Sequence, residues 1–447
     1  MNIERAFYQP NKCAKRYWFS VQTSLKNNVS LSGNGMKRLL GPEELKLWLF
    51  DRRTPFNVVV AARLAGGLEI AALQQTILRL QSSHPLLSAR IEGHGRPRLL
   101  TTPAQPIPLE SAVRQDDDHW RRVLEQELNR RLPVAEGPLL RITLLHGADA
   151  SDLILCACHA ATDALGVFTL LRDLLTLLAG AEITPRTPMP AFEELIPAEA
   201  FSSTEGATLR DQWWRRQTSE RLAAIDWDDL AGRLPVVGET RVLADELDPE
   251  TTTALMTRCR AEQTTMHGAL TASVLLAWAD EAAEVACAHS VSLRQRLEPP
   301  FGDEDGLCLS RVLTRHWIAP DTDFWALARE VRSQVSAAIQ RGEPFDRTLE
   351  TIRVLAPGGR LETGPEAVAT MTNPGLIALE PPQGRLSLRS AISAGTVMVD
   401  GPVISTATVA GRLTWLWTAP AHWSRVAESA LLSRQAIERL RRAVAKP

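Results

Sequence analysis

The hydrophobic pattern of residues 153–179 changes sharply at a histidine. Residues 153–158 (LILCAC) are a short, continuous apolar run, which predicts a buried strand that ends at His159. After a turn of small residues, Asp163 begins a segment with apolar positions at helical spacing that continues to Ala179. The sequence therefore predicts an imidazole at the end of a strand and a carboxylate at the start of the next helix.

Strand and helix patterns alternate along most of the chain. In the first half, strands are predicted at 57–64, 86–91 and 139–145, and helices at 43–50, 70–80 and 118–131. In the second half, strands are predicted at 241–246, 287–293, 367–373, 386–393, 396–399, 403–409 and 411–418, and helices at 212–221, 249–261, 265–279, 324–340 and 426–443. Strands interleaved with helices indicate a mixed α/β fold.

The chain divides into four segments. Residues 1–35 are polar and without a pattern, so we expect a flexible N-terminal extension. Residues 36–182 are predicted to form an N-terminal lobe that ends with the His159 unit, and residues 216–447 a C-terminal lobe. The proline-rich stretch within residues 183–215 is typical of a crossover linker. A length of 447 residues favours two lobes over one core.

The composition excludes several classes of function. A hydrophobic content of 45% with 23% charged residues is that of an ordinary globular protein, and a net charge of -2 argues against a nucleic-acid partner. Arg172 and Asp173 interrupt the most apolar window, so no transmembrane segment is predicted. Six cysteines without a CxxC pair indicate neither a metal site nor a disulfide framework, and with no signal peptide we expect a cytoplasmic protein. Two acidic runs, Asp116–Asp118 and Asp303–Asp305, are expected in solvated loops.

His159 is the candidate for chemistry, since a strand can fix an imidazole while a turn leaves its tip open to a cavity. The same pattern also fits a buried core histidine followed by an aspartate that caps a helix. Cys158 is expected on the opposite face of the strand, which argues against a Cys–His nucleophile pair. His84 is predicted to cap a helix end, and His267 to open a helix at the surface or at a contact between lobes.

Several phrases, in order over residues 37–443, resemble one superfamily. They are LGPEELKLWLF, LAGGLEIAALQQTILRLQSSHPLLSARI, GPLLRITLL, CHAATDALG, VSLRQRL and MTNPGL. Together they resemble the chloramphenicol-acetyltransferase-like superfamily, in particular stand-alone condensation domains of nonribosomal peptide synthesis and polyketide-associated acyltransferases. The resemblance implies two similar lobes that form a V with a tunnel between them.

The resemblance also assigns roles to residues. The second, catalytic histidine of the family signature HHxxxDG falls on His159, and the aspartate on Asp163. The family's arginine, expected on a strand, falls on Arg294, and its pairing with the aspartate implies that both residues support the active-site loop. A substrate-clamping role for Arg294 and a pairing by Arg296 instead are the alternatives.

This sequence departs from the family pattern at two signature positions. Cys158 replaces the first histidine and Ala164 the glycine, so Gly166 is expected to take over the tight turn beside the tunnel. No DFGWG-like phrase, which forms a latch between lobes in many members, occurs in the C-terminal third. Asn373 falls where the family's tunnel passes and is a candidate for the oxyanion site or tunnel, or alternatively a turn residue before Pro374.

The resemblance implies an acyltransferase of secondary-metabolite or lipid biosynthesis. The donor would be a thioester on the phosphopantetheine arm of an acyl or peptidyl carrier protein, or on coenzyme A, and the acceptor a small-molecule alcohol or amine. We expect no permanently bound cofactor, no metal and a monomer. The alternative is a catalytically inactive, condensation-like module that binds a carrier protein.

Overall fold

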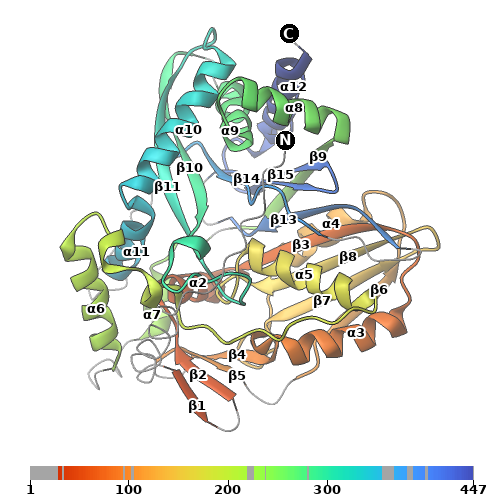
Figure 1. The fold of residues 1–447 in the computed structure, drawn as a ribbon, viewed down its shortest axis with the longest axis vertical. Coiled ribbons are helices and arrows are strands. Elements are labelled where there is room, and N and C mark those ends of the chain that lie inside the picture. The colour runs from red at the N-terminus through yellow and green to blue at the C-terminus, as the bar shows by residue number, and fades with distance from the viewer. Residues whose placement is uncertain are drawn as a thin grey trace, which may run out of the picture.

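The computed structural model describes residues 29–32, 35–93, 96–101, 105–218, 226–236, 238–278, 281–354, 367–379, 386–397 and 401–445. The elements form two lobes, each built around a β-sheet (Figure 1). The mixed α/β class predicted from the sequence is confirmed.

The N-terminal lobe has a five-stranded sheet in the order β13-β3-β8-β7-β6. Helices α3 and α5 pack together on one face of this sheet, and α4 packs on the other. Its elements in chain order are α2 (Pro42–Arg53), β3 (Asn57–Ala65), α3 (Ile70–Ser83), η1 (Pro85–Ser88), β4 (Ala89–Glu92), β5 (Arg98–Thr101), β6 (Leu109–Val113), α4 (His119–Leu128), β7 (Leu140–His146), β8 (Ala150–Cys158) and α5 (Ala164–Leu178).

The central strands of this sheet are apolar on both faces because helices cover both. On β3, Val58 and Val60 pack in the cluster with α3 and α5, whereas Val59 packs in the cluster with α4. On β8, Leu155 faces α3 and α5, and Cys158 belongs to the α4 cluster. This burial on both faces explains the continuous apolar run of the sequence.

The C-terminal lobe has a six-stranded sheet in the order β11-β10-β12-β14-β15-β9. Helices α8, α9, α10 and α12 cover one face around a core that includes Trp415 and Trp417 (Figure 1). The elements that follow the first lobe are η2 (Phe192–Leu195), η3 (Ala198–Ala200), α6 (Thr204–Thr218), α7 (Trp227–Gly232), β9 (Thr240–Leu247), α8 (Pro249–Ala261), α9 (Met266–Ala277), β10 (Ala283–Ser292), η5 (Arg294–Arg296), β11 (Leu309–Ile318), α10 (Phe324–Gln340), α11 (Glu343–Val354), β12 (Ala369–Thr372), β13 (Ser387–Gly395), β14 (Val403–Val409), β15 (Arg412–Pro420), η6 (Val426–Glu428) and α12 (Ser429–Ala445).

One strand from the C-terminal part of the chain joins the N-terminal sheet. β13 pairs antiparallel with β3, with Ser387 opposite Ala65 and Gly395 opposite Val58. The sequence predicts this segment in the C-terminal lobe, because its apolar pattern does not identify its partner strand. The two lobes are therefore connected by a shared sheet even though the DFGWG-like phrase is missing.

Much of the proposed N-terminal extension, residues 1–28 and 33–34, lies outside the described residues. Within the remainder, β1 (Val29–Ser32) pairs with β2 (Gly35–Leu39) in a four-stranded sheet of order β1-β2-β5-β4.

Four predicted elements differ in the structure. The strand predicted at 86–91 begins only at Ala89, because Pro85–Ser88 form a short 3₁₀ helix. The helix predicted at 212–221 begins earlier, at Thr204, so part of the proposed linker is helical. The predicted strand at 287–293 ends at Ser292, and Arg294–Arg296 form a short 3₁₀ turn, because the Arg294 side chain is directed to a neighbouring loop. In the strand predicted at 396–399, Thr396 and Val397 do not form a strand, and residues 398 and 399 lie outside the described residues.

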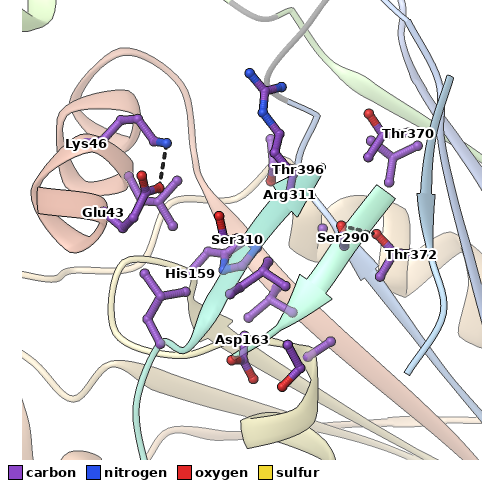
Figure 2. Close-up of a pocket in the computed structure, with 18 of the residues that line it drawn as sticks. Glu43, Lys46, His159, Asp163, Ser290, Ser310, Arg311, Thr370, Thr372 and Thr396 are labelled. Atoms are coloured by element: carbon purple, nitrogen blue, oxygen red, sulfur yellow. Dashed lines mark hydrogen bonds and ion pairs between the residues drawn. The ribbon is translucent and has the colours of Figure 1, made fainter. Parts of the chain in front are cut away.

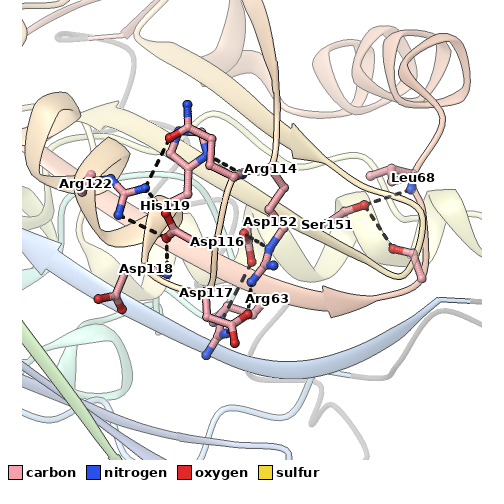
Figure 3. Close-up of polar contacts among 12 residues, drawn as sticks. Arg63, Leu68, Arg114, Asp116, Asp117, Asp118, His119, Arg122, Ser151 and Asp152 are labelled. Carbon is pink, nitrogen blue, oxygen red and sulfur yellow. Dashed lines mark hydrogen bonds and ion pairs between the residues drawn. The ribbon is translucent and has the colours of Figure 1, made fainter.

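The acidic run Asp116–Asp118 lies at the outer end of the N-terminal sheet (Figure 3). Asp116 and Asp117 are exposed, as predicted. Arg114 connects Asp117, at 2.6 Å, to the buried carboxylate of Asp152 on β8, at 2.9 Å. Burial raises the pKa of Asp152, and its contacts with Arg114 oppose that effect.

A hydrogen-bonded chain of three histidines runs through the C-terminal lobe. His267 Nε2 lies 2.8 Å from His289 Nδ1, and His289 Nε2 lies 2.8 Å from Thr314 Oγ1. The same hydroxyl lies 2.8 Å from His316 Nε2, and His316 Nδ1 lies 2.8 Å from Glu330 Oε1. His267 is thus part of a side-chain network within this lobe.

Candidate functional site

His159 directly follows β8, at the point where both lobes meet. Its backbone N–H donates to the carbonyl oxygen of Phe56 at 3.1 Å, which extends the pairing of β8 with β3 by one residue. The Phe56 ring stacks on the imidazole, with 5.6 Å between centroids and 17° between planes. The strand and the stacked ring together fix the position of the imidazole.

The hydrogen bonds of the imidazole define its tautomer. His159 Nδ1 lies 2.9 Å from the carbonyl oxygen of Thr162, and because a carbonyl only accepts, Nδ1 carries the proton. Nε2 therefore has a free lone pair, and the side chain lines a cavity (Figure 2). Burial lowers the pKa of His159, and the contact with Thr162 opposes this effect only in part. The site thus holds a neutral imidazole that can accept a proton at Nε2.

Asp163 contacts the protein framework. Its Oδ1 accepts from the backbone N–H of Gly166 at 2.9 Å, which caps α5, and Oδ2 accepts from the N–H of Cys308 at 2.9 Å. Arg294 Nη2 donates to Oδ1 at 3.1 Å. Asp163 is therefore both the helix cap suggested by the sequence and the partner of the arginine.

Arg294 is buried and holds a loop as well as the aspartate. Its guanidinium donates to the carbonyl oxygens of Glu304 and Gly306, at 2.9 Å each, and of Gly302 at 3.3 Å. It also lies over the Phe301 ring, 5.1 Å from the centroid. Arg296, the alternative partner, instead donates to the backbone oxygen of Ser292 at an exposed position.

The other predicted site residues lie in different places. Ala164 lines the cavity, whereas Gly166 does not; a Cβ at Gly166 would come within 2.1 Å of Thr162 Oγ1, so its missing side chain makes room for the turn. Asn373 lines the cavity, and its Oδ1 accepts from the N–H of Gly375 at 2.9 Å, as in a turn. Cys158 is buried in the core, and burial raises the pKa of its thiol.

The cavity has a volume of about 630 Å³ and lies between the lobes. The wall opposite His159 carries hydroxyl groups from three adjacent strands of the C-terminal sheet (Figure 2). These residues are Ser290 and Ser292 on β10, Thr370 and Thr372 on β12, and Ser405 on β14. The remaining wall near His159 is apolar and includes Phe56, Val58 and Leu307.

One end of the cavity is charged. On α2, Lys46 Nζ lies 2.5 Å from Glu43 Oε2 and 3.2 Å from Thr351 Oγ1 on α11 (Figure 2). Behind this pair, Glu193 Oε1 accepts from the N–H of Glu43 at 2.8 Å. Burial raises the pKa of Glu193 to about 8. Arg311 also lines this part of the cavity.

Helix α11 is not among the helices predicted from the sequence, and it contributes several cavity residues. These are Arg347, Glu350, Thr351, Arg353 and Val354. A signal was present, because Phe345, Leu349 and Ile352 have the i, i+4, i+7 spacing of an amphipathic helix and are buried. The hydroxyl wall had no comparable signal, since it depends on the register between strands.

Within the described ranges, no helix is both long enough and apolar enough to cross a membrane. The same part of the chain contains no cluster of three or more histidine, cysteine or acidic side chains placed to hold a metal ion.

Comparison with known proteins found one matching family model and several similar sequences and solved structures. Residues 238–414 match the family described as phthiocerol/phthiodiolone dimycocerosyl transferase C-terminus. The chain is 26% identical over 334 residues to the phosphinothricin tripeptide synthetase PhsC of Streptomyces viridochromogenes, a match that covers 69% of this chain and 30% of that protein. The chain spans between 2% and 30% of the length of the first curated relatives it matches.

Solved structures share the fold. The trichothecene 15-O-acetyltransferase of Fusarium sporotrichioides superposes with a TM-score of 0.68 at 12% identity, over 93% of this chain and 97% of that one. Polyketide synthase associated protein 5 of Mycobacterium tuberculosis superposes with a TM-score of 0.63 at 18% identity, over 92% and 98% of the two chains. The chain has the chloramphenicol-acetyltransferase-like fold that these solved structures share.

Proposed function

We propose that this domain transfers an acyl group from a thioester to a hydroxyl or amine, with His159 as general base. The observation that carries the proposal is the orientation of the imidazole, since Nδ1 donates to the carbonyl oxygen of Thr162 while the side chain lines the cavity between the lobes. A neutral imidazole in this tautomer accepts a proton at Nε2. The low pKa of His159, caused by burial, favours the neutral form at physiological pH.

The proposed reaction has two steps. The acceptor's O–H or N–H gives its proton to Nε2 of His159 while its oxygen or nitrogen attacks the thioester carbonyl carbon. The tetrahedral intermediate then expels the thiolate, which takes the proton back from the imidazolium as the C–S bond breaks. The products are an ester or amide and a free thiol, and no acyl-enzyme is required.

Asp163 and Arg294 are proposed to support the turn that holds His159. Both side chains are buried, and their hydrogen bonds go to each other and to backbone groups. Asp163 makes no hydrogen bond to the imidazole among the described contacts, which supports a structural role over a proton relay.

Asn373 is the proposed source of hydrogen bonds to the developing oxyanion. Its Oδ1 is held by Gly375, so its Nδ2 hydrogens are the donors left for a ligand in the cavity. Gly166 is proposed to act indirectly, since it leaves space for the side chain of Thr162.

The donor thioester is proposed to be a substrate carried on phosphopantetheine of a carrier protein or on coenzyme A. Peptide synthetases among the relatives favour a carrier protein, and the acetyltransferase among the structural neighbours favours a small thioester. The acceptor is proposed to be a small-molecule alcohol or amine, because the cavity holds about 630 Å³.

The test compares the wild type with His159→Ala and with the control Cys158→Ala. Thiol release from a panel of acyl-coenzyme A and acyl-pantetheine donors is measured with alcohol and amine acceptors, and products are identified by mass spectrometry. We expect His159→Ala to lose roughly 10²–10⁴-fold in turnover, while Cys158→Ala stays active. Equal turnover of wild type and His159→Ala, or none in any protein with any donor, would contradict the proposal and favour a carrier-binding module.

A further inference from the structure

His84 is a buried histidine between two carboxylates from different parts of the fold. It follows the last turn of α3 and has no exposed surface. Its Nδ1 lies 2.8 Å from Oδ1 of Asp305, and its Nε2 lies 3.2 Å from Oδ2 of Asp173 on α5. His84 is the C-cap residue of α3, as predicted from the sequence, and its side chain also connects α5 to a loop of the C-terminal lobe.

The charges around His84 are those of an ion cluster. Asp173 also contacts Arg172 on α5, at 3.1 Å, and Arg186 in the segment that follows α5. Among the described residues Asp305 forms no ion pair with an arginine, although Arg294 attracts it at longer range, and its buried Oδ2 has no hydrogen bond. His84 is thus the cation closest to Asp305, and a buried carboxylate is costly without a partner.

These neighbours control the charge of His84. Burial alone lowers its pKa, but the contacts with Asp173 and Asp305 outweigh burial and leave the pKa above the ordinary value. A protonated imidazole donates to Asp305 from Nδ1 and places its positive charge next to Asp173, with which Nε2 forms an ion pair. A neutral ring donates at one nitrogen only, and its other lone pair would face a carboxylate.

Asp305 belongs to the loop 301–308, which we call the clasp loop. The N-terminal lobe and the segment that follows it contact this loop at further positions besides His84. Arg172 Nη1 lies 2.9 Å from Asp303 Oδ2, and the N–H of Thr187 donates to Glu304 at 2.7 Å. The predicted acidic run Asp303–Asp305 is therefore no purely solvated loop, because it holds the lobes together.

The clasp loop also reaches the catalytic turn. Three of its carbonyl oxygens accept hydrogen bonds from Arg294, and the N–H of Cys308 donates to Asp163. Asp163 caps the helix that follows the turn of His159. A continuous series of contacts thus runs from His84 through the clasp loop to the base.

We propose that His84, as an imidazolium, is a positioning residue that locks the clasp loop onto the N-terminal lobe and so holds the turn of His159. The contact between His84 and the clasp loop does not depend on any catalytic activity. Its effect on turnover rests on the proposed function. Because the folded state raises the pKa of His84, the lock contributes fully below the ordinary histidine pKa and is lost as pH rises through the folded value. We therefore expect the clasp loop to detach from the N-terminal lobe at alkaline pH.

The test is hydrogen–deuterium exchange of peptides that cover residues 301–308, measured at about pH 7 and about pH 9 and expressed as protection factors. In the wild type we expect protection to fall at the higher pH, because His84 loses its proton there. His84→Asn should show the low protection at both pH values. The control is Arg79→Gln on the same helix, which removes an exposed pair with Glu182 and should behave as wild type.

A second variant keeps the test decisive if His84→Asn does not fold. Asp305→Asn removes one of the two carboxylates that raise the pKa of His84, so the loss of protection should move to lower pH. Protection that is equal in the wild type and His84→Asn, or an opening pH that Asp305→Asn leaves unchanged, would overturn the proposal. None of these readouts needs an acyl donor.

Where turnover is measurable, the alkaline limb of kcat/KM gives an additional readout. His84→Asn should lose that limb, since the group that titrates is gone, whereas a purely structural role would lower activity equally at all pH values. A retained alkaline limb in His84→Asn would contradict the positioning role while leaving the acyl-transfer proposal intact.

Discussion

Protonation of His267 is expected to make the C-terminal lobe less stable in acid. The carboxylate of Glu330 only accepts, so His316 donates to it from Nδ1 and accepts from Thr314 at Nε2. The hydroxyl oxygen of Thr314 then accepts from His289 Nε2, and His289 Nδ1 accepts from His267 Nε2. Because burial lowers the pKa of both His267 and His289, these two rings are neutral in this arrangement, and Nδ1 of His267 is the site left for another proton.

The magnitude follows from proton linkage. Burial lowers the pKa of His267 from 6.5 to about 4, so stability is complete above pH 6.5 and is lost as pH falls toward 4. These two values predict a loss of about 2 kcal/mol at about pH 5 relative to about pH 7.5, and about 3 kcal/mol at the acid limit. Burial also lowers the pKa of His289, which adds to the loss in the wild type.

The variant His267→Gln isolates this effect, because a glutamine amide can still donate to His289 but does not titrate. The assay is urea unfolding followed by tryptophan fluorescence, since Trp278 stacks on Trp417 in this lobe, with centroids 5.4 Å apart. Between the two pH values the wild type should lose about 2 kcal/mol more than His267→Gln. The exposed His422→Gln is the control. An equal loss in wild type and His267→Gln would refute the reasoning.

Four further predictions concern the candidate site. Because burial lowers the pKa of His159, the acid limb of kcat/KM should lie below pH 6.5, and activity should fall as the imidazole is protonated; a limb above that value would contradict the assignment. Arg294→Gln leaves a buried carboxylate unpaired and should destabilise the protein by about 3–5 kcal/mol in urea unfolding, and a change within error would argue against the pair. Gly166→Ala puts a Cβ 2.1 Å from Thr162 Oγ1, so it should cost about 1–3 kcal/mol by overpacking and be rescued by Thr162→Ala; no rescue would point to another cause. A Cβ at Gly395 would lie 3.7 Å from the His159 ring, in ordinary contact, so Gly395→Ala should fold and retain small acceptors while Gly395→Leu should exclude them; equal kcat/KM for both variants would show that acceptors do not pass this position.

The local part of the site could be predicted from the sequence. β8 ends at Cys158, α5 begins at Ala164, and Asp163 caps it, because apolar runs and capping residues act within a few positions of the chain. The pairing of Asp163 with Arg294 followed from the family resemblance, since the two residues are far apart in the chain.

The sequence predictions that were wrong concern residues whose structure depends on contacts between distant segments. Asp305 has the sequence of a solvated loop, and only the fold brings it to His84. The segment of β13 reads as an ordinary strand, and its pairing with β3 depends on the arrangement of the lobes. Arg294 lies in a turn where its apolar neighbours suggested a strand. Local hydrophobic patterns carry no information on such partners.

The pairing of β13 with β3 has a consequence for biosynthesis. While the ribosome is still making the middle of the chain, β3 has its partner β8 on one side and an open, apolar edge on the other. That edge closes only after residue 395 has left the exit tunnel. Open edges of this kind attract wrong partners, so we expect the nascent N-terminal half to be prone to mispairing until β13 is added. The two halves produced as separate polypeptides should each aggregate, and co-expression should restore a soluble complex.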